Sequence, residues 1–368
     1  MMDFHWSKQV RLIGFGLLLI LSIGICSIIP AAASDPQQDI PTVDPALLAQ
    51  ADRSDSLDYL ITFEEEADLS KAYALSWEDR GWYVVNALTA LADDTQADVR
   101  DYLEETGVTY EAFWIQNAIA VESSNRATLE GLLDYWEIDS IGLIPEVSLT
   151  EFEVLSEGAE VTETRSTMEN LTHINADDVW DMGYTGEGIV VGNIDTGVRY
   201  THSALEDQYR GNDGGTVDHN YNWWDAVNGQ DAAYDDNGHG THTMGIMVGQ
   251  DDFGNTFGVA PGAEWIACKA FPDSGSGSGT DLLQCGQFML APTDLNGNNA
   301  NPALRPHVVN NSWGDCDQIY DDWYEDTIDA WHAAGIYPVF SNGNAGNCED
   351  YAYPPGLNTV ETLPVLTM

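Results

Sequence analysis

The chain has 368 residues, of which 43% are hydrophobic, so it can bury the cores of two ordinary domains. Acidic residues outnumber basic residues by 61 to 12, which gives a formal net charge of −49. Such a surface repels phosphates and excludes nucleic acid as a partner. Two explanations for the acidic surface stay open: ordinary solubility, and adaptation to salty water.

The N-terminus has the pattern of an export signal. Lys8 and Arg11 precede an apolar run over residues 12–29, and three alanines follow at 31–33. Small residues after an apolar run favour cleavage, so we expect residues 1–33 to be a signal peptide and the mature protein to be secreted. Because the run is close to the length of a membrane span, an uncleaved anchor is the alternative.

A small α+β domain is predicted over residues 57–149, after a polar, proline-containing linker at 34–56. Its expected strands are at 57–63, 113–115, 118–121 and 140–147, and its expected helices at about 69–105 and 126–136. A second polar stretch, rich in Glu and Thr, is predicted to be a linker over residues 150–170.

Strands and helices alternate over the remaining residues, 171–368. The run 188–194 is almost continuously apolar, which is typical of a strand buried in a parallel sheet. Further strands are expected at 259, 265–267, 308–309 and 337–340, and helices near His239, Asp281 and Asp321. The alternation predicts an α/β fold with a mostly parallel, doubly wound sheet, whose site lies at the carboxyl ends of the strands.

Four cysteines remain after removal of the signal peptide: Cys268, Cys285, Cys316 and Cys348. An even number in an exported protein permits disulfides, here with three possible connectivities. Buried free thiols are the alternative, and none of the spacings is that of a zinc site.

Asp195 directly follows a predicted strand, in the motif Asp195-Thr196-Gly197. A carboxylate at that position can orient an imidazole, although a loop-capping role is commoner for such a residue. The same motif occurs in aspartic proteases, with Asp273 as the possible second copy. The two motifs lie too close in sequence for two pepsin-like lobes, so that alternative is weak.

His239 lies between two glycines in a motif that runs from Asn237 to Gly245. The glycines leave room for close approach of backbone and substrate. A metal site that pairs His239 with His242 is the alternative. It lacks the Glu of the zinc protease helix motif and has no evident third ligand.

These two motifs resemble those of the subtilisin family, and most of all those of its bacillopeptidase F-type members. The similarity runs from about residue 173 to residue 358, and it includes the segments 258–263, 308–314 and 339–344. Residues 57–149 resemble, more loosely, the family's propeptide, a small domain that assists folding and then inhibits. The resemblance implies a subtilisin-like fold and a serine endopeptidase with an Asp-His-Ser triad.

The resemblance also assigns roles to single residues. Asp195 would hold the imidazole, His239 would act as general base, and Asn344 would donate to the oxyanion. The substrate backbone would pair, as an added strand, with residues on the two sides of a cleft: Ser312, Trp313 and Gly314 on one side, and Gly277 and Gly279 on the other.

The expected nucleophile is missing from this sequence. The family places its Ser in a Gly-Thr-Ser-type turn well after the position of Asn344, whereas no Ser follows Ser341 here. We therefore expect a catalytic domain truncated before its nucleophile and inactive as it stands. A non-enzymatic inhibitor or pseudoprotease that carries the propeptide-like domain is the alternative.

The expected partners are protein or peptide substrates and the chain's own propeptide as an intramolecular inhibitor. No cofactor is expected for catalysis. Calcium is common in the family, and the acidic loop 231–236 is its candidate site, with a solvated loop as the alternative. Cys316 and Cys348 are expected to form a disulfide, because both follow elements that wall the specificity pocket. Trp313, beside that pocket, is expected to favour large apolar groups.

Overall fold

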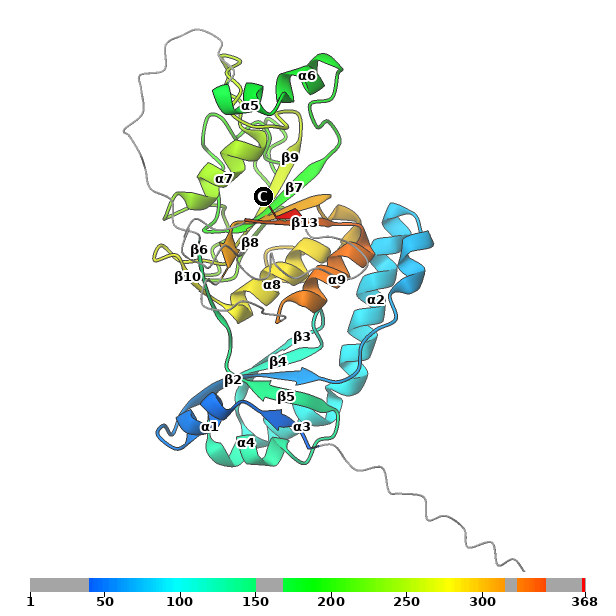
Figure 1. Cartoon of the computed structure of the whole chain (residues 1–368), viewed down its shortest axis with the longest axis vertical. Coiled ribbons are helices and arrows are strands. Elements are labelled where there is room, and N and C mark those ends of the chain that lie inside the picture. The colour runs from blue at the N-terminus through cyan, green and yellow to red at the C-terminus, as the bar shows by residue number, and fades with distance from the viewer. Residues whose placement is uncertain (1–39, 150–167, 315–322, 342–365, 368) are drawn as a thin grey trace, which may run out of the picture. The chain divides into compact units, whose positions relative to one another are not determined.

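The computed structural model describes residues 40–149, 168–314, 323–341 and 366–367 (Figure 1). Residues 40–149 are called the N-terminal part below, and residues 168–367 the C-terminal part. The predicted signal peptide, Asn344, Cys316 and Cys348 lie outside the described residues. No described helix is long and apolar enough to cross a membrane.

The N-terminal part contains a five-stranded sheet with the order β1-β5-β2-β4-β3. β1 runs parallel to β5, and the other neighbours are antiparallel. The strands are β1 (Thr42–Val43), β2 (Leu57–Phe63), β3 (Thr109–Phe113), β4 (Ala118–Ser124) and β5 (Ile138–Gly142). The helices are α1 (Pro45–Ala51), the 3-10 helix η1 (Ser70–Ala74), α2 (Trp77–Thr95), α3 (Ala97–Thr106) and α4 (Arg126–Leu132).

The two faces of this sheet bury different neighbours, because successive side chains of a strand point to opposite faces. Tyr59 and Ile61 of β2 belong to a core shared with α1, α3 and α4. Leu60, between them, belongs to a second core, which includes Phe288 and Trp331 of the C-terminal part. The sheet is therefore packed against helices on both sides.

The linker predicted at residues 34–56 is wrong from Thr42 onward. β1 adds an edge strand to the sheet, and α1 buries Leu47 completely in the first core. Asp44 caps α1 by accepting the N–H of Ala46 at 2.7 Å. Pro45, which suggests a linker in the sequence, is the first residue of the helix, where its missing N–H costs nothing.

The C-terminal part is built on a six-stranded sheet with the order β14-β13-β11-β7-β9-β8, and every pairing in it is parallel. The strands are β7 (Val190–Asp195), β8 (Trp223–Asp225), β9 (Glu264–Lys269), β11 (Val308–Asn311), β13 (Tyr337–Phe340) and β14 (Leu366–Thr367). The helices are α5 (Glu169–His173), α6 (Ala176–Asp181), α7 (His239–Val248), α8 (Gly279–Leu290), the 3-10 helix η2 (Pro302–Leu304) and α9 (Glu325–Ala334).

Helices cover both faces of the parallel sheet. Val191 and Trp265 share a core with Met244 of α7. Ile194 and Ile266 share the other core with α8 and α9. This arrangement confirms the predicted α/β fold. The strand expected at Val259 is absent, because that residue lies in a loop after α7.

A disulfide joins Cys268 of β9 to Cys285 of α8, with their Cα atoms 5.6 Å apart. This pairing is one of those that the sequence left open. It is compatible with the predicted bond between Cys316 and Cys348, which stays a prediction.

Candidate active site

Asp195 and His239 form a buried pair at the carboxyl end of the parallel sheet. Asp195 is the last residue of β7, and His239 is the first residue of α7. The imidazole Nδ1 lies 2.7 Å from Asp195 Oδ1, and the exposed fractions of the His and Asp side chains are 6% and 0%. The structure thus brings together the two side chains that the motifs single out.

A glycine at position 240 permits this approach. A Cβ on Gly240 would lie 2.1 Å from the Gly197 carbonyl oxygen and 3.0 Å from the Asp195 Cβ. Gly197 has a φ of 98°, in the left-handed region that favours glycine. The two glycines therefore set how closely α7 meets the loop after β7.

The Asp195 carboxylate is held by further donors. Its Oδ1 accepts the N–H of Thr196 at 2.7 Å, and its Oδ2 accepts the hydroxyl of Thr243 at 3.2 Å. Asp273 is not among its partners, so the geometry gives no support to a pair of catalytic aspartates.

Two charged residues that sequence reasoning missed hold the surrounding loops. The Asp235 carboxylate accepts hydrogen bonds from the hydroxyls of Thr196 and Thr241 and from the N–H of Gly238. It thereby ties the loop after β7 to the start of α7. The signal for it in the sequence is its position four residues before His239.

Lys269 is fully buried at the end of β9, beside Asp195 in the sheet register. Its ammonium donates to the Thr196 carbonyl at 2.7 Å, the Phe271 carbonyl at 2.8 Å and Asp236 Oδ1 at 2.6 Å. One cation thus joins the loops that carry Asp195 and His239 to the segment after β9. Its signal in the sequence is a lysine directly after an apolar strand in a chain with very few lysines.

A three-stranded antiparallel sheet, with the order β10-β6-β12, contains the predicted substrate-binding residues. β10 (Ser276–Ser278) and β12 (Trp313–Gly314) are its edges, and β6 (Glu146–Leu149) of the N-terminal part lies between them. In the register, Gly277 pairs with Val147, and Trp313 pairs with Leu149. β6 is therefore an extended segment that pairs on both sides with residues predicted to bind the substrate backbone, and their binding of a substrate stays a prediction.

Glycines make one wall of this cleft. A Cβ on Gly277 would come within 2.7 Å of the Phe271 ring, and a Cβ on Gly279 within 3.0 Å of Pro145. The Gly279 N–H donates to the Pro145 carbonyl at 2.7 Å. Gly279 therefore lets the chain just before β6 approach closely, while Gly277 leaves room for the Phe271 ring.

The opposite wall uses backbone more than side chains. The Trp313 side chain is 1% exposed and packs on the rings of Phe271, Tyr324 and Phe340, in the core. Ser312 precedes β12 and accepts a hydrogen bond from Asn310 Nδ2 at 3.0 Å. Gly314 pairs with Ser148 of β6. A preference of Trp313 for large apolar groups stays a prediction.

Metal ligands do not gather at this site. Among the described residues, no group of three His, Cys, Asp or Glu side chains is placed to hold a metal ion. In the candidate calcium loop 231–236, Asp235 and Asp236 bind protein groups instead. The pKa of His242 lies below its usual value because of burial and, to a lesser extent, the neighbouring His239.

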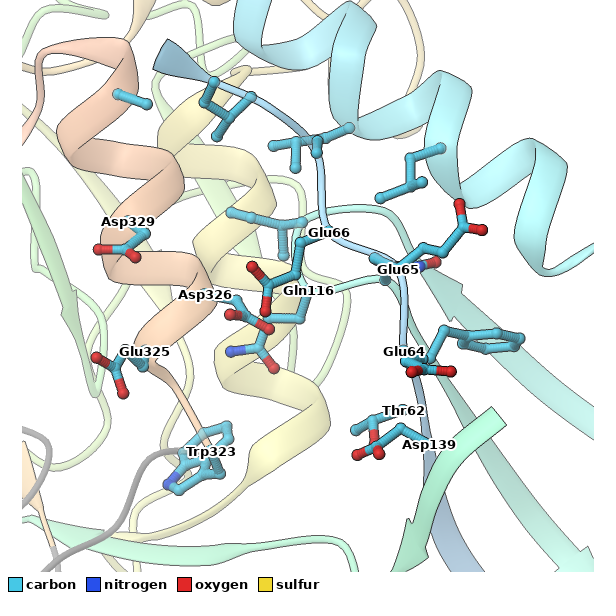
Figure 2. Close-up of a pocket in the computed structure, with 18 of the residues that line it drawn as sticks. Thr62, Glu64, Glu65, Glu66, Gln116, Asp139, Trp323, Glu325, Asp326 and Asp329 are labelled. Atoms are coloured by element: carbon cyan, nitrogen blue, oxygen red, sulfur yellow. Dashed lines mark hydrogen bonds between the residues drawn. The ribbon is translucent and has the colours of Figure 1, made fainter. Parts of the chain in front are cut away.

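A separate cavity of about 870 Å³ lies between the N-terminal part and α9, and it is strongly acidic. Figure 2 shows Glu66 extending toward α9, which carries Asp326 and Asp329. The carboxylates that line the cavity are those of Glu64, Glu65, Glu66, Asp139, Glu325, Asp326 and Asp329. The pKa of Asp329 is raised, first by burial and then by the negative charges of Glu325 and Glu66.

The sequence is similar to those of known proteins. Residues 186–365 match the model of the subtilase family. The chain is 39% identical over 276 residues to bacillopeptidase F of Bacillus subtilis, which covers 71% of this chain and 19% of that protein. It is 34% identical over 178 residues to the minor extracellular protease Vpr of B. subtilis, covering 47% of this chain and 20% of that protein. The chain thus spans about a fifth of the length of these relatives.

Proposed function

The chain belongs to the subtilase family, and on that premise we propose that it acts as a secreted serine endopeptidase with an inhibitory propeptide. The observation that carries the proposal is the buried Asp195–His239 pair, together with a cleft that takes an extended segment as a strand. A cleft of this kind aligns a peptide backbone, and an oriented imidazole activates a nucleophile.

The chemistry follows from the geometry of the pair. When the His239 Nδ1–H donates to Asp195 Oδ1, the tautomer leaves Nε2 to accept the proton of a serine hydroxyl. Asp195 then stabilises the imidazolium that forms. Asn344 is the proposed side-chain donor to the oxyanion. No Ser follows Ser341, so these 368 residues alone are expected not to hydrolyse peptides.

The N-terminal part is proposed to be the propeptide. Its strand β6 occupies the place in which a substrate would pair with Gly277 and Gly314. Protein or peptide substrates would therefore compete with β6 for the same hydrogen bonds. No cofactor or nucleic acid enters this proposal, and calcium at residues 231–236 stays a prediction.

Secretion is supported by the pattern of residues 1–33 and by two relatives from B. subtilis, Vpr and Epr, that are named extracellular proteases.

A second candidate function is a non-enzymatic inhibitor. The same pairing of β6 with β10 and β12 favours it. Both candidates predict that residues 40–149 inhibit a complete relative in trans at micromolar concentration, and failure of that inhibition removes the propeptide assignment.

Labelling by a fluorophosphonate probe separates the two candidates. We expect no labelling of the 368-residue chain, and labelling once the Ser-containing segment of a relative is joined to its C-terminus. In that longer chain His239→Ala should abolish labelling, whereas His173→Ala, at an exposed histidine, should leave it unchanged. If the longer chain folds but is never labelled, the proposal of a serine endopeptidase is wrong. If the unextended chain is labelled, the prediction that its 368 residues lack the nucleophile is wrong.

A further inference from the structure

Trp77, Arg80 and Gly81 lie on one face of the first turns of α2, because their spacing is i, i+3 and i+4. This face contacts η2 and the end of α9 in the C-terminal part. None of these residues belongs to the strands of the cleft. Ser76 fixes the start of α2, since its hydroxyl accepts the N–H of Asp79 and donates to the Asp79 carboxylate.

Two arginines, one from each part, converge on the last turn of α9. Arg80 donates to the carbonyls of His332 and Ala333, both at 2.5 Å. Arg305, which is 1% exposed, donates to the Ala334 carbonyl at 2.7 Å and, from the same nitrogen, to the Trp77 carbonyl at 2.6 Å. The last carbonyls of a helix lack partners inside it and carry partial negative charge, so guanidinium groups suit them.

Aromatic contacts complete the junction. The Arg305 guanidinium lies 3.7 Å from the centre of a Trp77 ring, and the Trp77 and His307 rings stack with centroids 4.5 Å apart. His307 is in turn bonded to β7, since its ring Nδ1 accepts the N–H of Val190 and its backbone N–H donates to the Val190 carbonyl. The first turn of α2 is thus joined to the start of the central strand.

We propose that this junction, the arginine clamp (Trp77, Arg80, Arg305 and His307), is the specificity-determining contact by which the propeptide recognises its own protease domain. The inference rests on the proposed function. β10 and β12 pair with the backbone of β6, and most of the packing of the sheet on α8 and α9 is apolar and therefore non-directional. The hydrogen bonds of Gln287 to the Trp114 N–H and of Gln284 to Glu111 add to it at α8. The clamp requires particular side chains in fixed geometry, because guanidinium forks donate along set directions.

Gly81 shows how narrow this requirement is. A Cβ at that position would lie 2.4 Å from Arg305 Nη1 and 3.0 Å from the Pro302 carbonyl oxygen. The clamp therefore fits a helix whose first residue, i, is aromatic and which has Arg at i+3 and Gly at i+4. A helix with any side chain at the glycine position would displace Arg305.

The test uses the whole chain, with a site for a sequence-specific protease placed within residues 150–167. After cleavage there, the dissociation constant of the two fragments is measured. We expect Arg80→Ala and Gly81→Ala each to weaken association at least tenfold. Arg100→Ala should leave it unchanged, since that guanidinium bonds only within the N-terminal part. Arg305→Ala should weaken association with the wild-type N-terminal fragment. It should cause little further loss of affinity when the N-terminal fragment already carries Trp77→Ala.

Circular dichroism of each separated fragment controls for unfolding. Arg305 also bonds within its own part, so the variants of the N-terminal fragment decide the result if Arg305→Ala unfolds. Wild-type affinity in both Arg80→Ala and Gly81→Ala overturns the clamp. The assay needs no serine and no turnover, so a failure of the proposed peptidase chemistry leaves its result unaffected.

Discussion

At the scale of single residues, the Asp195–His239 distance depends on a residue that has no side chain. A methyl group on Gly240 would overlap the Gly197 carbonyl, so Gly240→Ala should push α7 away from β7 and break the hydrogen bond. The low-field proton resonance of His239 Nδ1–H should then disappear from the NMR spectrum. Gly245→Ala, on the same helix and facing open space, should keep it. Retention of the resonance in both variants would contradict this account.

Lys269 is the second residue on which the site depends. Lys269→Met removes the cation and leaves two carbonyls and Asp236 without their donor. Because Asp236 is 37% exposed and can be rehydrated, we expect a loss of about 2–4 kcal/mol in the free energy of unfolding, measured with urea. Lys71→Met, at an exposed lysine, is the control. Equal urea midpoints for the two variants would show that Lys269 does not stabilise these loops.

The sequence predicted Asp195 and His239 because each lies in a short motif with its own chemistry. It did not predict Lys269 or Asp235, whose roles depend on which loops meet after folding. A lysine after an apolar strand is usually a strand end in water, and only the sheet register shows Lys269 beside Asp195. Trp313 illustrates the opposite case, since its backbone reaches the cleft while its side chain faces the core.

At the scale of elements, the first turn of α8 and strand β3 of the N-terminal part each carry a carboxylate, Asp281 and Glu111, and the two repel each other. Asp281 of α8 has a pKa raised to about 7 by burial and by the neighbouring carboxylates of Glu111, Asp225 and Glu122. The pKa of Glu111 on β3 is also raised, mainly by burial. Protonation of Asp281 therefore favours the packed arrangement of the two elements.

The pH dependence follows from that shift. The folded chain holds the Asp281 proton more tightly than the unfolded chain, so this stabilisation is complete below about pH 4 and is lost as the pH rises through about 7. Asp281→Asn, which mimics the protonated acid, should flatten the fall in melting temperature between pH 4 and pH 8. Asp252→Asn, in an exposed loop, should leave the curve unchanged. Parallel curves for wild type and Asp281→Asn would exclude the carboxyl as the source.

Element boundaries were predictable where side-chain periodicity was strong. β2, α4 and β7 lie close to the residues that the alternating and helical patterns indicated. The patterns failed where tertiary pairing decides. β1 is two residues long and exists because β5 offers it an edge, and β6 is separate from β5 because it pairs with β10 and β12. No local signal in residues 140–149 shows that their second half joins another sheet.

At the scale of the whole molecule, the acidic residues behind the net charge of −49 are not spread evenly over the surface. Seven carboxylates line one cavity, where three consecutive glutamates of the N-terminal part meet α9 (Figure 2). Like charges held together on folding oppose it. The chain therefore places part of its repulsion at the junction of its two parts, which neither its composition nor its motifs indicated.

Salt should relieve that repulsion, because the Debye length falls to about 3 Å at 1 M. We expect the melting temperature to rise between low and molar sodium chloride. Asp329→Asn removes a charge that faces Glu66, so it should raise the low-salt melting temperature by about 2 °C and reduce the gain from salt. Asp252→Asn should follow the wild type. A wild-type curve that stays flat would mean that the acidic surface serves solubility alone. A rising curve that Asp329→Asn leaves unchanged would place the repulsion outside the cavity.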